Sequence, residues 1–482
     1  MKRRQSTAII AALILLTQVS CAGEPIEQQE STETEFQESE IQTEQIYTLE
    51  LPEVDYQGED FTIFMRNSQY FIGDQFADEL NGEILNDSLY NRNLAVQNLF
   101  NINFKLAISS DSTYGTDAKN SILSGDDTYD LIAVHARAAF GYGYDHLALD
   151  WNKDLPYVNL DMPWYNADAQ KLAVNGKLYQ MTGDISYQSF GRIVGMIFNK
   201  DIFDDLNIDY PYQSALDGKW TMDEFIRLSK LAVMDLDGDG QITFEKDRLG
   251  YITDWNYGPN QALFSSGEHM AIVNDDGWME LSVNTPRTIE VFEKFFAFTD
   301  SESAHIQIRG DVNNVITLFK NKYTLFVDIL LDNIRNLRDM ESEFGILPWP
   351  KYDEQCEKYY SLMGAGSNMF VVPISVNDPE RASIIIEALS YYGWRDVLPN
   401  YKLSVIEGKY SRDEDSLPML DLIYEGQTFD VAYFYDTGIF SSKLSDTGLN
   451  LAADQNHNFA SFYAANESSA LACIKKINAA YE

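Results

Sequence analysis

The sequence is poor in cysteine, in basic residues and in long apolar runs, and each shortage excludes a class of protein. Three cysteines among 482 residues exclude a disulfide-stapled scaffold and a zinc module built from several cysteines. Lys and Arg number 35 against 75 Asp and Glu, a formal net charge of −40. Nucleic acids and anionic lipid surfaces attract clustered positive charge, so neither is expected as a partner. Apart from a short N-terminal run, no segment is long and apolar enough to span a membrane.

The common catalytic motifs are missing as well. The chain has no Gly-x-Ser-x-Gly elbow, no His-Glu-x-x-His pair, no phosphate-binding loop and no Gly-x-Gly-x-x-Gly turn. A carboxylate pair for glycoside hydrolysis stays open, because 75 acidic residues always offer pairs somewhere. No spacing singles out one acid for that role, so we expect a protein that is not an enzyme.

The N-terminus has the pattern of an export signal. Lys2, Arg3 and Arg4 precede the short apolar run Ala8–Leu16, and small residues follow. Cys21, after Val19 and Ser20, resembles the acylated cysteine of bacterial lipoproteins, which implies a lipid anchor on Cys21. Gln18 departs from that pattern, since Leu is usual there, and ordinary cleavage after Ala22 is the alternative. We predict a signal peptide over residues 1–21 and an extracytoplasmic, membrane-anchored protein.

Residues 22–52 are predicted to form an acidic tether. Between Gly23 and Gln45 the chain has eight Glu and no basic residue, so it cannot bury apolar surface and repels itself into an extended form. A spacer is favoured over an acidic interaction tail. The two later cysteines, Cys356 and Cys473, either pair or stay free, and the sequence does not decide between these states.

Over the full sequence 45% of the residues are apolar, enough for two or three packed units at roughly 100 to 200 residues each. Apolar runs alternate with amphipathic segments, which is typical of parallel βαβ units in an α/β fold. In the first part we expect a helix over Asp87–Phe100 and strands over Phe61–Met65, Asn103–Leu106 and Tyr129–Val134. Further strands are expected over Ile193–Phe198, Leu249–Ile252, Phe344–Leu347 and Asn368–Val372. Thr221 opens a capping box for a helix to about Ala232, and another helix begins at Asp378–Pro379.

The order of several short motifs resembles one known family. These motifs are Gly176-Lys-Leu-Tyr179 before a strand that ends in Phe-Asn-Lys-Asp, then Trp220-Thr-Met-Asp-Glu-Phe, Gly345-Ile-Leu-Pro-Trp-Pro-Lys and Asn368-Met-Phe-Val-Val-Pro. Together with the N-terminal pattern, they resemble the family-1 extracellular solute-binding lipoproteins of ABC importers, many of which bind sugars. The resemblance runs from about residue 55 to 480.

The resemblance implies a two-lobe fold of the type II periplasmic-binding-protein kind, with three hinge crossings. By analogy the crossings lie near 184–192, 358–366 and 400–406. The first lobe would then comprise 53–185 with 360–402, and the second 186–359 with 403–482.

Candidate ligand residues follow from strand ends and from the resemblance. Ligands of open α/β sheets bind beyond the carboxyl ends of strands, and a sugar needs aromatic faces and planar polar groups. The resemblance adds the loop at the first hinge. Candidates are Arg66, Asn67, His135, Arg137, Asp184, Tyr187, Asp254, Trp255, Asn256 and Tyr257. Trp164 and Tyr165 form a further pair that looks exposed. Taken singly, each aromatic is more often a core residue, and His135 is equally a helix-capping or surface histidine.

Residues 235–247 resemble an EF-hand-type calcium loop. Asp235, Asp237, Asp239 and Gln241 place oxygen ligands at alternating positions, with a glycine for the turn. The twelfth position departs from the pattern because it is Lys246, and Asp247, one residue later, could replace the usual Glu. The alternative is a solvated acidic turn without metal. The expected ion is a structural Ca²⁺, and no cofactor is required for function.

These patterns predict a monomeric binding protein that captures a small solute, most simply an oligosaccharide, by hinge closure and presents it to an ABC permease. A peptide or another solute is the alternative ligand. A ligand-capturing sensor or adhesin subunit on the cell surface is the alternative role.

Overall fold

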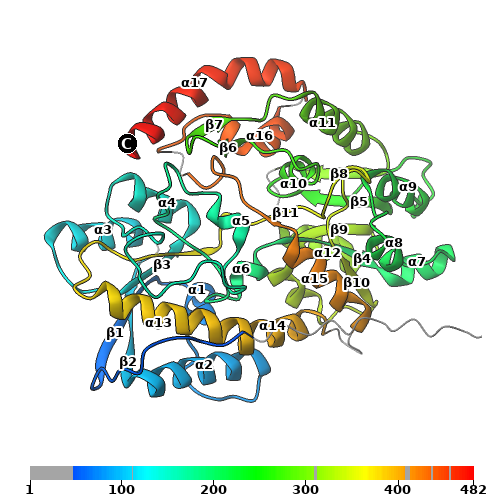
Figure 1. Cartoon of the computed structure of the whole chain (residues 1–482). Helices are drawn as coiled ribbons and strands as arrows, with labels where there is room; N and C mark the ends of the chain where they lie inside the picture. Colours follow the sequence, from blue (N-terminus) through cyan, green and yellow to red (C-terminus); the bar gives the residue numbers. More distant parts are fainter. Residues whose placement is uncertain (1–46, 111, 309–311, 408–412, 436–437, 455–456) are drawn as a thin grey trace, which may run out of the picture. The chain divides into compact units, whose positions relative to one another are not determined.

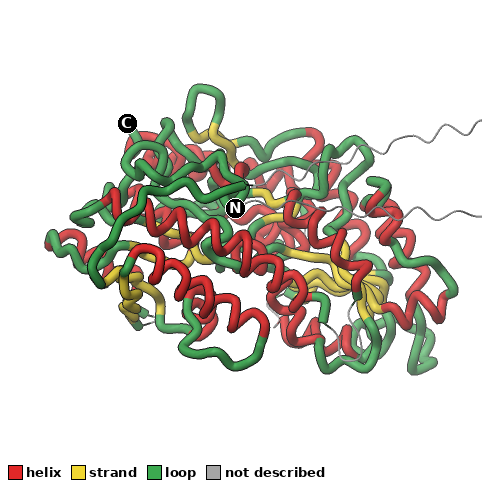
Figure 2. The backbone as a smooth tube through the Cα atoms, turned by 60° about the horizontal axis from the view of Figure 1, so that its bottom comes forward, coloured by secondary structure: helices red, strands yellow, loops and turns green. Residues whose placement is uncertain are grey.

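The computed structural model describes residues 47–482 except 111, 309–311, 408–412, 436–437 and 455–456. The predicted signal peptide, Cys21 and the tether up to residue 46 lie outside the described residues. Among the described residues, no helix combines the length and the hydrophobicity that a membrane span needs. Residues 49–482 pack as one unit, which holds two main sheets flanked by helices (Figures 1 and 2).

The first sheet has four strands in the order β12-β3-β1-β2, and we call this sheet with its helices the first lobe. β1 lies between β2 and β3 and pairs in parallel with both, whereas β12 runs antiparallel to β3. Apolar side chains of β1 form the core of this lobe, since Phe61, Ile63, Phe64 and Met65 are all buried. The strands are β1 (Glu59–Arg66), β2 (Ile102–Ser109), β3 (Leu131–His135) and β12 (Asn368–Val371). The helices are α1 (Gln69–Gln75), α2 (Ile84–Phe100), α3 (Tyr114–Ser124), α4 (Ala136–Tyr144) and α13 (Pro379–Tyr392).

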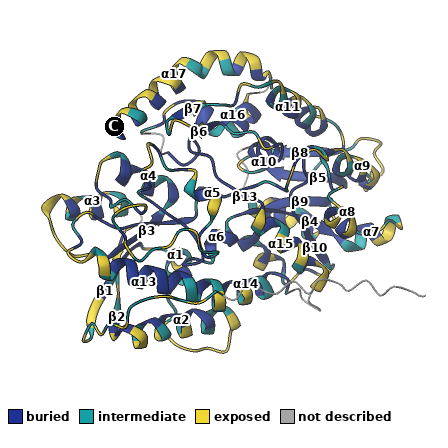
Figure 3. Ribbon diagram, viewed as in Figure 1, coloured by how far each residue is buried: buried dark blue, intermediate teal, exposed yellow. Residues whose placement is uncertain are grey.

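The second sheet has five strands in the order β10-β4-β9-β5-β8 and defines the second lobe. β9, β5 and β8 are parallel, while β4 is antiparallel to its neighbours β9 and β10. Every residue of β4, β5 and β9 is buried (dark blue in Figure 3), because helices cover both faces of the sheet. The strands are β4 (Val194–Asn199), β5 (Leu249–Asp254), β8 (Ala304–Gln307), β9 (Thr324–Leu330) and β10 (Phe344–Leu347). The helices are α7 (Lys200–Leu206), α8 (Tyr212–Leu216), α9 (Met222–Ala232), α10 (Gly258–Phe264), α11 (Pro286–Thr299), α12 (Val312–Lys320) and the 3-10 helix η1 (Leu331–Leu337).

The remaining elements are short, except for the last helix. They are α5 (Ala167–Gln170), α6 (Gln188–Gly191), the hairpin β6 (Ala271–Val273) and β7 (Met279–Leu281), the pair β11 (Ser361–Leu362) and β13 (Gln427–Thr428), the π-helical turn η2 (Gly393–Val397), α14 (Leu398–Val405), the 3-10 turns η3 (Glu414–Ser416) and η4 (Lys443–Asp446), α15 (Leu417–Glu425), α16 (Thr447–Ala453) and α17 (Phe459–Ala480). The stretch after β13 contacts the first lobe, since the ring centroids of Tyr435 and of Phe140 in α4 lie 5.0 Å apart.

The chain passes between the two sheets three times. It leaves the first sheet after β3 and enters the second at β4, and it returns between β10 and β12. It leaves again after α13, which packs on α2, and reaches α15, which packs on β10. The segments 184–192, 358–366 and 400–406 lie within these three connections, but the residues at which the chain bends stay a prediction.

A buried polar cluster joins two of these connections. The carboxyl group of Asp74 in α1 accepts hydrogen bonds from Ser186 Oγ (2.5 Å), Gln188 N (3.2 Å) and Asn368 Nδ2 (2.8 Å). Arg92 of α2, also buried, donates to the carbonyl oxygen of Ile185 (2.7 Å). The first connection, which leaves the first lobe, and the start of β12, where the chain returns to it, are therefore tied to the same carboxylate.

The predicted strands and helices are found, with small shifts at their ends. Thr221 accepts a hydrogen bond from Glu224 N and Asp378 one from Arg381 N, so both predicted helix starts are confirmed. The helix predicted from Asp87 begins three residues earlier, at Ile84, where the side chain of Glu83 caps it by accepting from Asn86 N.

One expectation about exposure is wrong. Trp164 and Tyr165 are buried, at 1% and 4% exposure, because both side chains donate to the carboxylate of Glu387 on α13. This contact spans more than 220 residues of chain. Cys356 and Cys473 are both buried and unpaired, which decides the question that the sequence left open.

Candidate ligand-binding site

A cavity of about 230 Å³ lies where the two lobes face each other. We call it the interlobe cavity. Its wall combines residues of both lobes with the connections between them and the segment after β13. The lining residues are His135, Arg137, Arg192, Asn256, Tyr257, Leu330, Gly364, Ala365, Gly366, Tyr433, Asp446 and Leu449.

The strand topology explains why these residues meet. β3 ends at His135, and β12 starts at the same edge of the sheet because Asn368 pairs with His135. In the second sheet β5 and β9 end at Asp254 and Leu330, and the antiparallel strand β4 starts beside the end of β9. The cavity therefore lies at the carboxyl ends of parallel strands in both sheets, where ligands of open α/β sheets bind.

Arg137 is fixed from two sides. Its Nε donates to the carbonyl oxygen of Tyr433 (3.0 Å), and its NH2 group donates to the carboxylate of Asp446 (2.9 Å). The Tyr433 ring lies 4.8 Å from the guanidinium carbon. Asn260 Nδ2 donates to the other oxygen of Asp446 (2.5 Å). Burial raises the pKa of Asp446 above its usual value, although the charge of Arg137 acts in the opposite direction.

His135 and Tyr257 present polar atoms with defined roles. His135 Nδ1 accepts from the backbone N–H of Arg137 (3.2 Å), which assigns the proton of a neutral ring to Nε2. His135 thereby caps α4 and also lines the cavity, so it has both of the roles that the sequence left open. Burial raises the pKa of Tyr257 to about 12, while the charge of Arg192 partly lowers it. Its hydroxyl group stays protonated at neutral pH and can donate a hydrogen bond.

Arg192 lies at the entry to β4. Its backbone N–H donates to Gln188 O (3.0 Å), and its carbonyl oxygen accepts from Gly364 N (2.9 Å). The guanidinium carbon lies 3.9 Å from the centroid of the Tyr70 ring. The two bonds hold the main chain of Arg192, and the Tyr70 ring supports its guanidinium.

A second cavity of about 240 Å³ lies near the first. Arg335 in its wall and Arg192 in the wall of the interlobe cavity both lie against the Tyr70 ring. Tyr187 and Tyr401 stack in this second cavity with ring centroids 4.9 Å apart. Its lining is Glu83, Leu85, Tyr187, Leu331, Asp332, Arg335, Arg338, Tyr401, Ser404 and Val405.

Five predicted ligand residues line these two cavities and five do not. His135, Arg137, Asn256 and Tyr257 line the interlobe cavity, and Tyr187 lines the second one. The other five, described next, are Arg66, Asn67, Asp184, Asp254 and Trp255.

Two of these five, Asp184 and Asp254, are buried carboxylic acids. Asp184 accepts from the hydroxyl group of Tyr424 (2.8 Å), and burial raises its pKa to about 7. Asp254 accepts from Asn256 N (2.9 Å), so it shapes the loop that carries Asn256 and Tyr257. Both acids therefore have structural partners in place of a position at either cavity.

The other three lie nearer the surface but line neither cavity. The guanidinium of Arg66 lies over the rings of Phe71 and Tyr114, at 5.0 and 5.4 Å. Asn67 is exposed, and Trp255 is partly buried beside the two residues that do line the cavity.

The sequence did not single out Arg192, Tyr433, Asp446 or the segment Gly364–Gly366. Arg192 directly precedes a predicted strand, but only the antiparallel direction of β4 brings its start to this edge. The two glycines before the strand at Asn368 are the one local signal that could have indicated a close approach.

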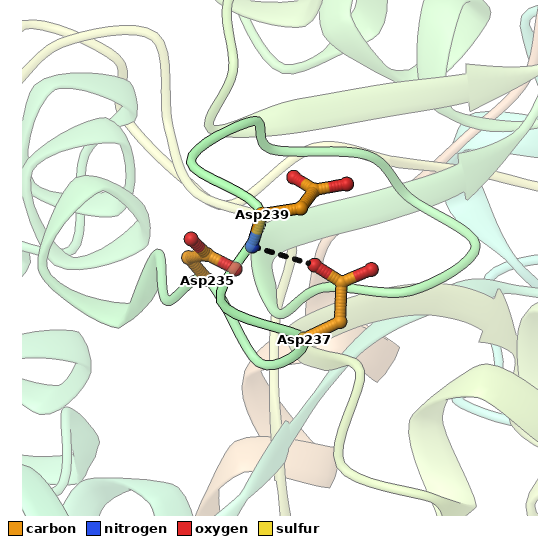
Figure 4. Close-up of side chains that lie close together, drawn as sticks. All are labelled: Asp235, Asp237 and Asp239. Atoms are coloured by element: carbon orange, nitrogen blue, oxygen red, sulfur yellow. Dashed lines mark hydrogen bonds between the residues drawn. The ribbon is translucent and has the colours of Figure 1, made fainter.

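The acidic loop after α9 has its first three candidate ligands together. Carboxylate oxygens of Asp235, Asp237 and Asp239 all lie within 4.8 Å of one another (Figure 4). Lys246 Nζ lies 3.2 Å from Asp237 Oδ2 and 3.7 Å from Asp239 Oδ2. The ammonium group at the twelfth position thus lies beside two of the three clustered carboxylates.

The other two predicted metal residues lie differently. Asp247 accepts from Leu236 N (2.9 Å) and Thr243 N (2.8 Å), so its carboxylate bridges the ends of the loop. Gln241 is exposed, and its backbone N–H donates to Asp239 Oδ1 (2.8 Å). The structure therefore groups three of the five predicted residues.

Comparison with known proteins gives a fold but no sequence relative. No family model matches the chain, and no curated protein matches it. Solved structures do match. One is a cyclo/maltodextrin-binding protein complexed with maltotetraose, with a TM-score of 0.58 and 13% identity over 87% of this chain and 97% of that chain.

Two further structures match over the same extent. A sugar transporter from Rhizobium etli in an open conformation has a TM-score of 0.57 and 12% identity, over 87% of this chain and 98% of that chain. The cyclic alpha-maltosyl-1,6-maltose binding protein from Arthrobacter globiformis has a TM-score of 0.53 and 14% identity, over 88% and 99%. The chain has the two-lobe fold of solute-binding proteins, which confirms the predicted fold class. At these identities the likeness is one of fold.

Proposed function

We propose that this protein is an extracytoplasmic solute-binding protein that captures an oligosaccharide in the interlobe cavity. The observation that carries the proposal is the cavity itself, which lies at the strand ends of both sheets and is lined from both lobes. The fold neighbours described as maltodextrin and cyclic maltosyl-maltose binding proteins support a carbohydrate as the ligand.

The lining offers the contacts that a sugar needs. The rings of Tyr257 and Tyr433 provide apolar faces for the C–H groups of a pyranose. Arg137, His135 and Asn256 provide donors for hydroxyl groups. None of this requires bond-making chemistry, so the protein acts by binding and release.

Binding would couple to movement of the lobes. A ligand held by Tyr257 from the second lobe and Arg137 from the first makes its full set of contacts only when the lobes are close together. Such a ligand favours the closed form by its differential affinity for the two forms. The closed, loaded form would then dock on an ABC permease.

The anchoring and the assembly state belong to the same proposal. A lipid on Cys21 and the acidic tether would hold a monomer near the permease on the outer side of the membrane. The export-signal pattern at residues 2–16 and the Cys21 motif support this placement.

We also propose that Asp235, Asp237 and Asp239 hold a structural Ca²⁺ ion. Hard divalent cations prefer several oxygen ligands at close range, which this turn provides. The ammonium group of Lys246 would have to swing away from the carboxylates, which predicts weak binding that is filled only at extracellular, millimolar calcium.

Thermal unfolding of the chain from Ala22 onward, against oligosaccharides and short peptides, tests the proposed function. A ligand at 100 times its Kd adds about 2.7 kcal/mol to the free energy of unfolding. Stabilisation by sugars is the expected result. Stabilisation by peptides alone would overturn the ligand class, and no stabilisation by any member of a broad panel would favour the sensor or adhesin role.

A pair of variants then locates the site. Tyr257→Ala removes a ring from the cavity wall, so the affinity for the stabilising sugar should fall at least about tenfold, or about 1.4 kcal/mol. Trp255→Ala removes an aromatic two residues away that lines neither cavity and should keep the affinity. Equal losses in both variants, measured by calorimetry, would contradict this location.

A further inference from the structure

We propose that the interlobe cavity selects oligosaccharides that carry a carboxylate, as uronic acids do, and that Arg192 binds this carboxylate. This inference rests on the proposed function and names the class of its ligand. The geometry that points to it is a guanidinium without an acid partner in the wall of the cavity.

The charges of the cavity wall do not balance. Arg137 and Asp446 form an ion pair at 2.9 Å, and Asn260 occupies the other oxygen of Asp446. Of the described residues that line the cavity, two are arginines, Arg137 and Arg192, and one is an acid, Asp446. The cavity therefore keeps one positive charge, in a chain with a net charge of −40.

The guanidinium of Arg192 has no acceptor among the residues that the structure describes. Among the described residues, no carboxylate lies within 4.0 Å of its guanidinium and no group accepts a hydrogen bond from it. Its Nε is buried without a partner. In the second cavity, by contrast, the arginine does have an acid partner. The guanidinium of Arg335 lies 3.6 Å from a carboxylate oxygen of Asp332. A buried donor without a partner calls for a physical explanation, and a group that arrives from outside supplies one.

The position of the guanidinium leaves room for such a group. The Tyr70 ring covers one face of it at 3.9 Å. A Cβ atom at Gly366 would lie 3.6 Å from the guanidinium carbon and 3.7 and 3.8 Å from its two terminal nitrogens, which places it over a face of the group, so glycine at this position leaves that face open. The backbone bonds to Gln188 and Gly364 fix the main chain of Arg192 at the cavity wall, and the edge of its guanidinium includes the unpartnered Nε.

A carboxylate fits this edge better than a hydroxyl group does. The planar guanidinium donates two parallel hydrogen bonds to a carboxylate, and the charges strengthen them in a site that is partly shielded from water. A neutral sugar would leave the charge without a counterion. Sites built to pair with one group discriminate strongly against analogues that lack it.

Calorimetry with matched ligands tests the selectivity. The chain from Ala22 onward is titrated with oligomers of galacturonate, glucuronate and mannuronate, each beside its methyl ester, and with neutral oligosaccharides. We expect at least one acid to bind tenfold or more tightly than its ester. Added salt should weaken the binding of the acid and leave that of the ester unchanged.

Variants test the assignment to Arg192. In Arg192→Gln the acidic sugar should bind only as tightly as its methyl ester. Arg192→Lys keeps the charge but cannot donate two parallel hydrogen bonds, so its affinity for the acidic sugar should be intermediate. Arg227→Gln, on an exposed face of α9, should behave as the wild type. Thermal melting shows whether each variant is folded, and the lysine variant keeps the test decisive if the glutamine variant is not.

Each other outcome has a defined meaning. If neutral oligosaccharides bind and no acid binds more tightly than its ester, this inference is overturned while the proposed function stands. If the acid is preferred equally by Arg192→Gln, the assignment to Arg192 is wrong. If no sugar binds, the proposed function fails and this inference fails with it.

Discussion

A single buried acid in the middle of β9 makes the stability of the second lobe depend on pH. Asp328 is fully buried, and the nearby hydroxyl groups of Thr253 and Tyr251 offset only part of its lost hydration. Burial therefore raises its pKa to about 7, well above the usual value of 3.8. The folded protein holds a proton on Asp328 between about pH 4 and 7 that the unfolded chain has released.

We predict that Asp328→Asn stabilises the protein at high pH. Asp328 contributes most to the free energy of unfolding at a pH below its pKa in the unfolded chain. This contribution is lost as the pH rises through its pKa in the folded protein, near 7. Asparagine has the same shape and no proton to lose. At about 1.4 kcal/mol per pKa unit, its advantage over Asp328 should grow by roughly 2 kcal/mol between pH 5 and pH 8.

Chemical unfolding at both pH values measures this difference. Asp209→Asn, at an exposed position, is the control and should not change the pH profile. A gain for Asp328→Asn that is the same at pH 5 and pH 8 would show that the carboxyl group does not titrate in this range.

At the scale of elements, the loop after α9 shows how one position can weaken a metal motif. The loop keeps the spacing and the clustered carboxylates of a calcium loop, but Lys246 places a positive charge beside two of them. A cation bound there competes with that ammonium group, which costs affinity through repulsion and lost hydrogen bonds.

We predict that Lys246→Glu tightens calcium binding by at least tenfold. The substitution removes the competing charge and supplies the carboxylate that EF-hand loops carry at the twelfth position. The rise in melting temperature on adding calcium, reversed by a chelator, measures the effect. Lys230→Glu on the exposed face of α9 changes the net charge equally and should leave calcium binding as it is. A similar response of both variants would assign the effect to net charge alone.

Single elements could be predicted from the sequence where their signal is local. β1 and β4 are largely apolar runs, and α9 and α13 start at capping residues, so these local signals located the strands at Phe61–Met65 and Ile193–Phe198 and both helices, whereas β9, which carries Asp328, was not predicted. Contacts over long distances left no such signal. Trp164 was expected to be exposed because its partner Glu387 lies 223 positions further along the chain. The ion pair of the cavity could not be predicted either, because Arg137 and Asp446 are 309 positions apart.

At the scale of the whole molecule, Asp74 connects the passages between the lobes. Its carboxylate accepts from residues of the first connection and from the start of β12, and Arg92 lies close enough for their charges to interact. The two side chains are fully buried together, so each depends on the other for compensation of its charge.

We predict that Asp74→Ala lowers the free energy of unfolding by about 3 kcal/mol or more, because it leaves Arg92 buried without its counterion and removes the acceptor of four donors. Denaturant titration measures the loss. Asp78→Ala, at an exposed position four residues away, should change stability by less than about 0.5 kcal/mol. Comparable stability of the two variants would show that the connections hold their geometry without Asp74.

The two native cysteines of the folded part, Cys356 and Cys473, are 7% and 6% exposed and unpaired. Without Cys21, the folded chain would therefore offer little reactive thiol to a maleimide dye, and one cysteine introduced on the surface of each lobe could be labelled selectively. Energy transfer between donor and acceptor dyes would then report the separation of the lobes in single molecules, so the motion assumed for ligand capture becomes a distance that can be followed in time.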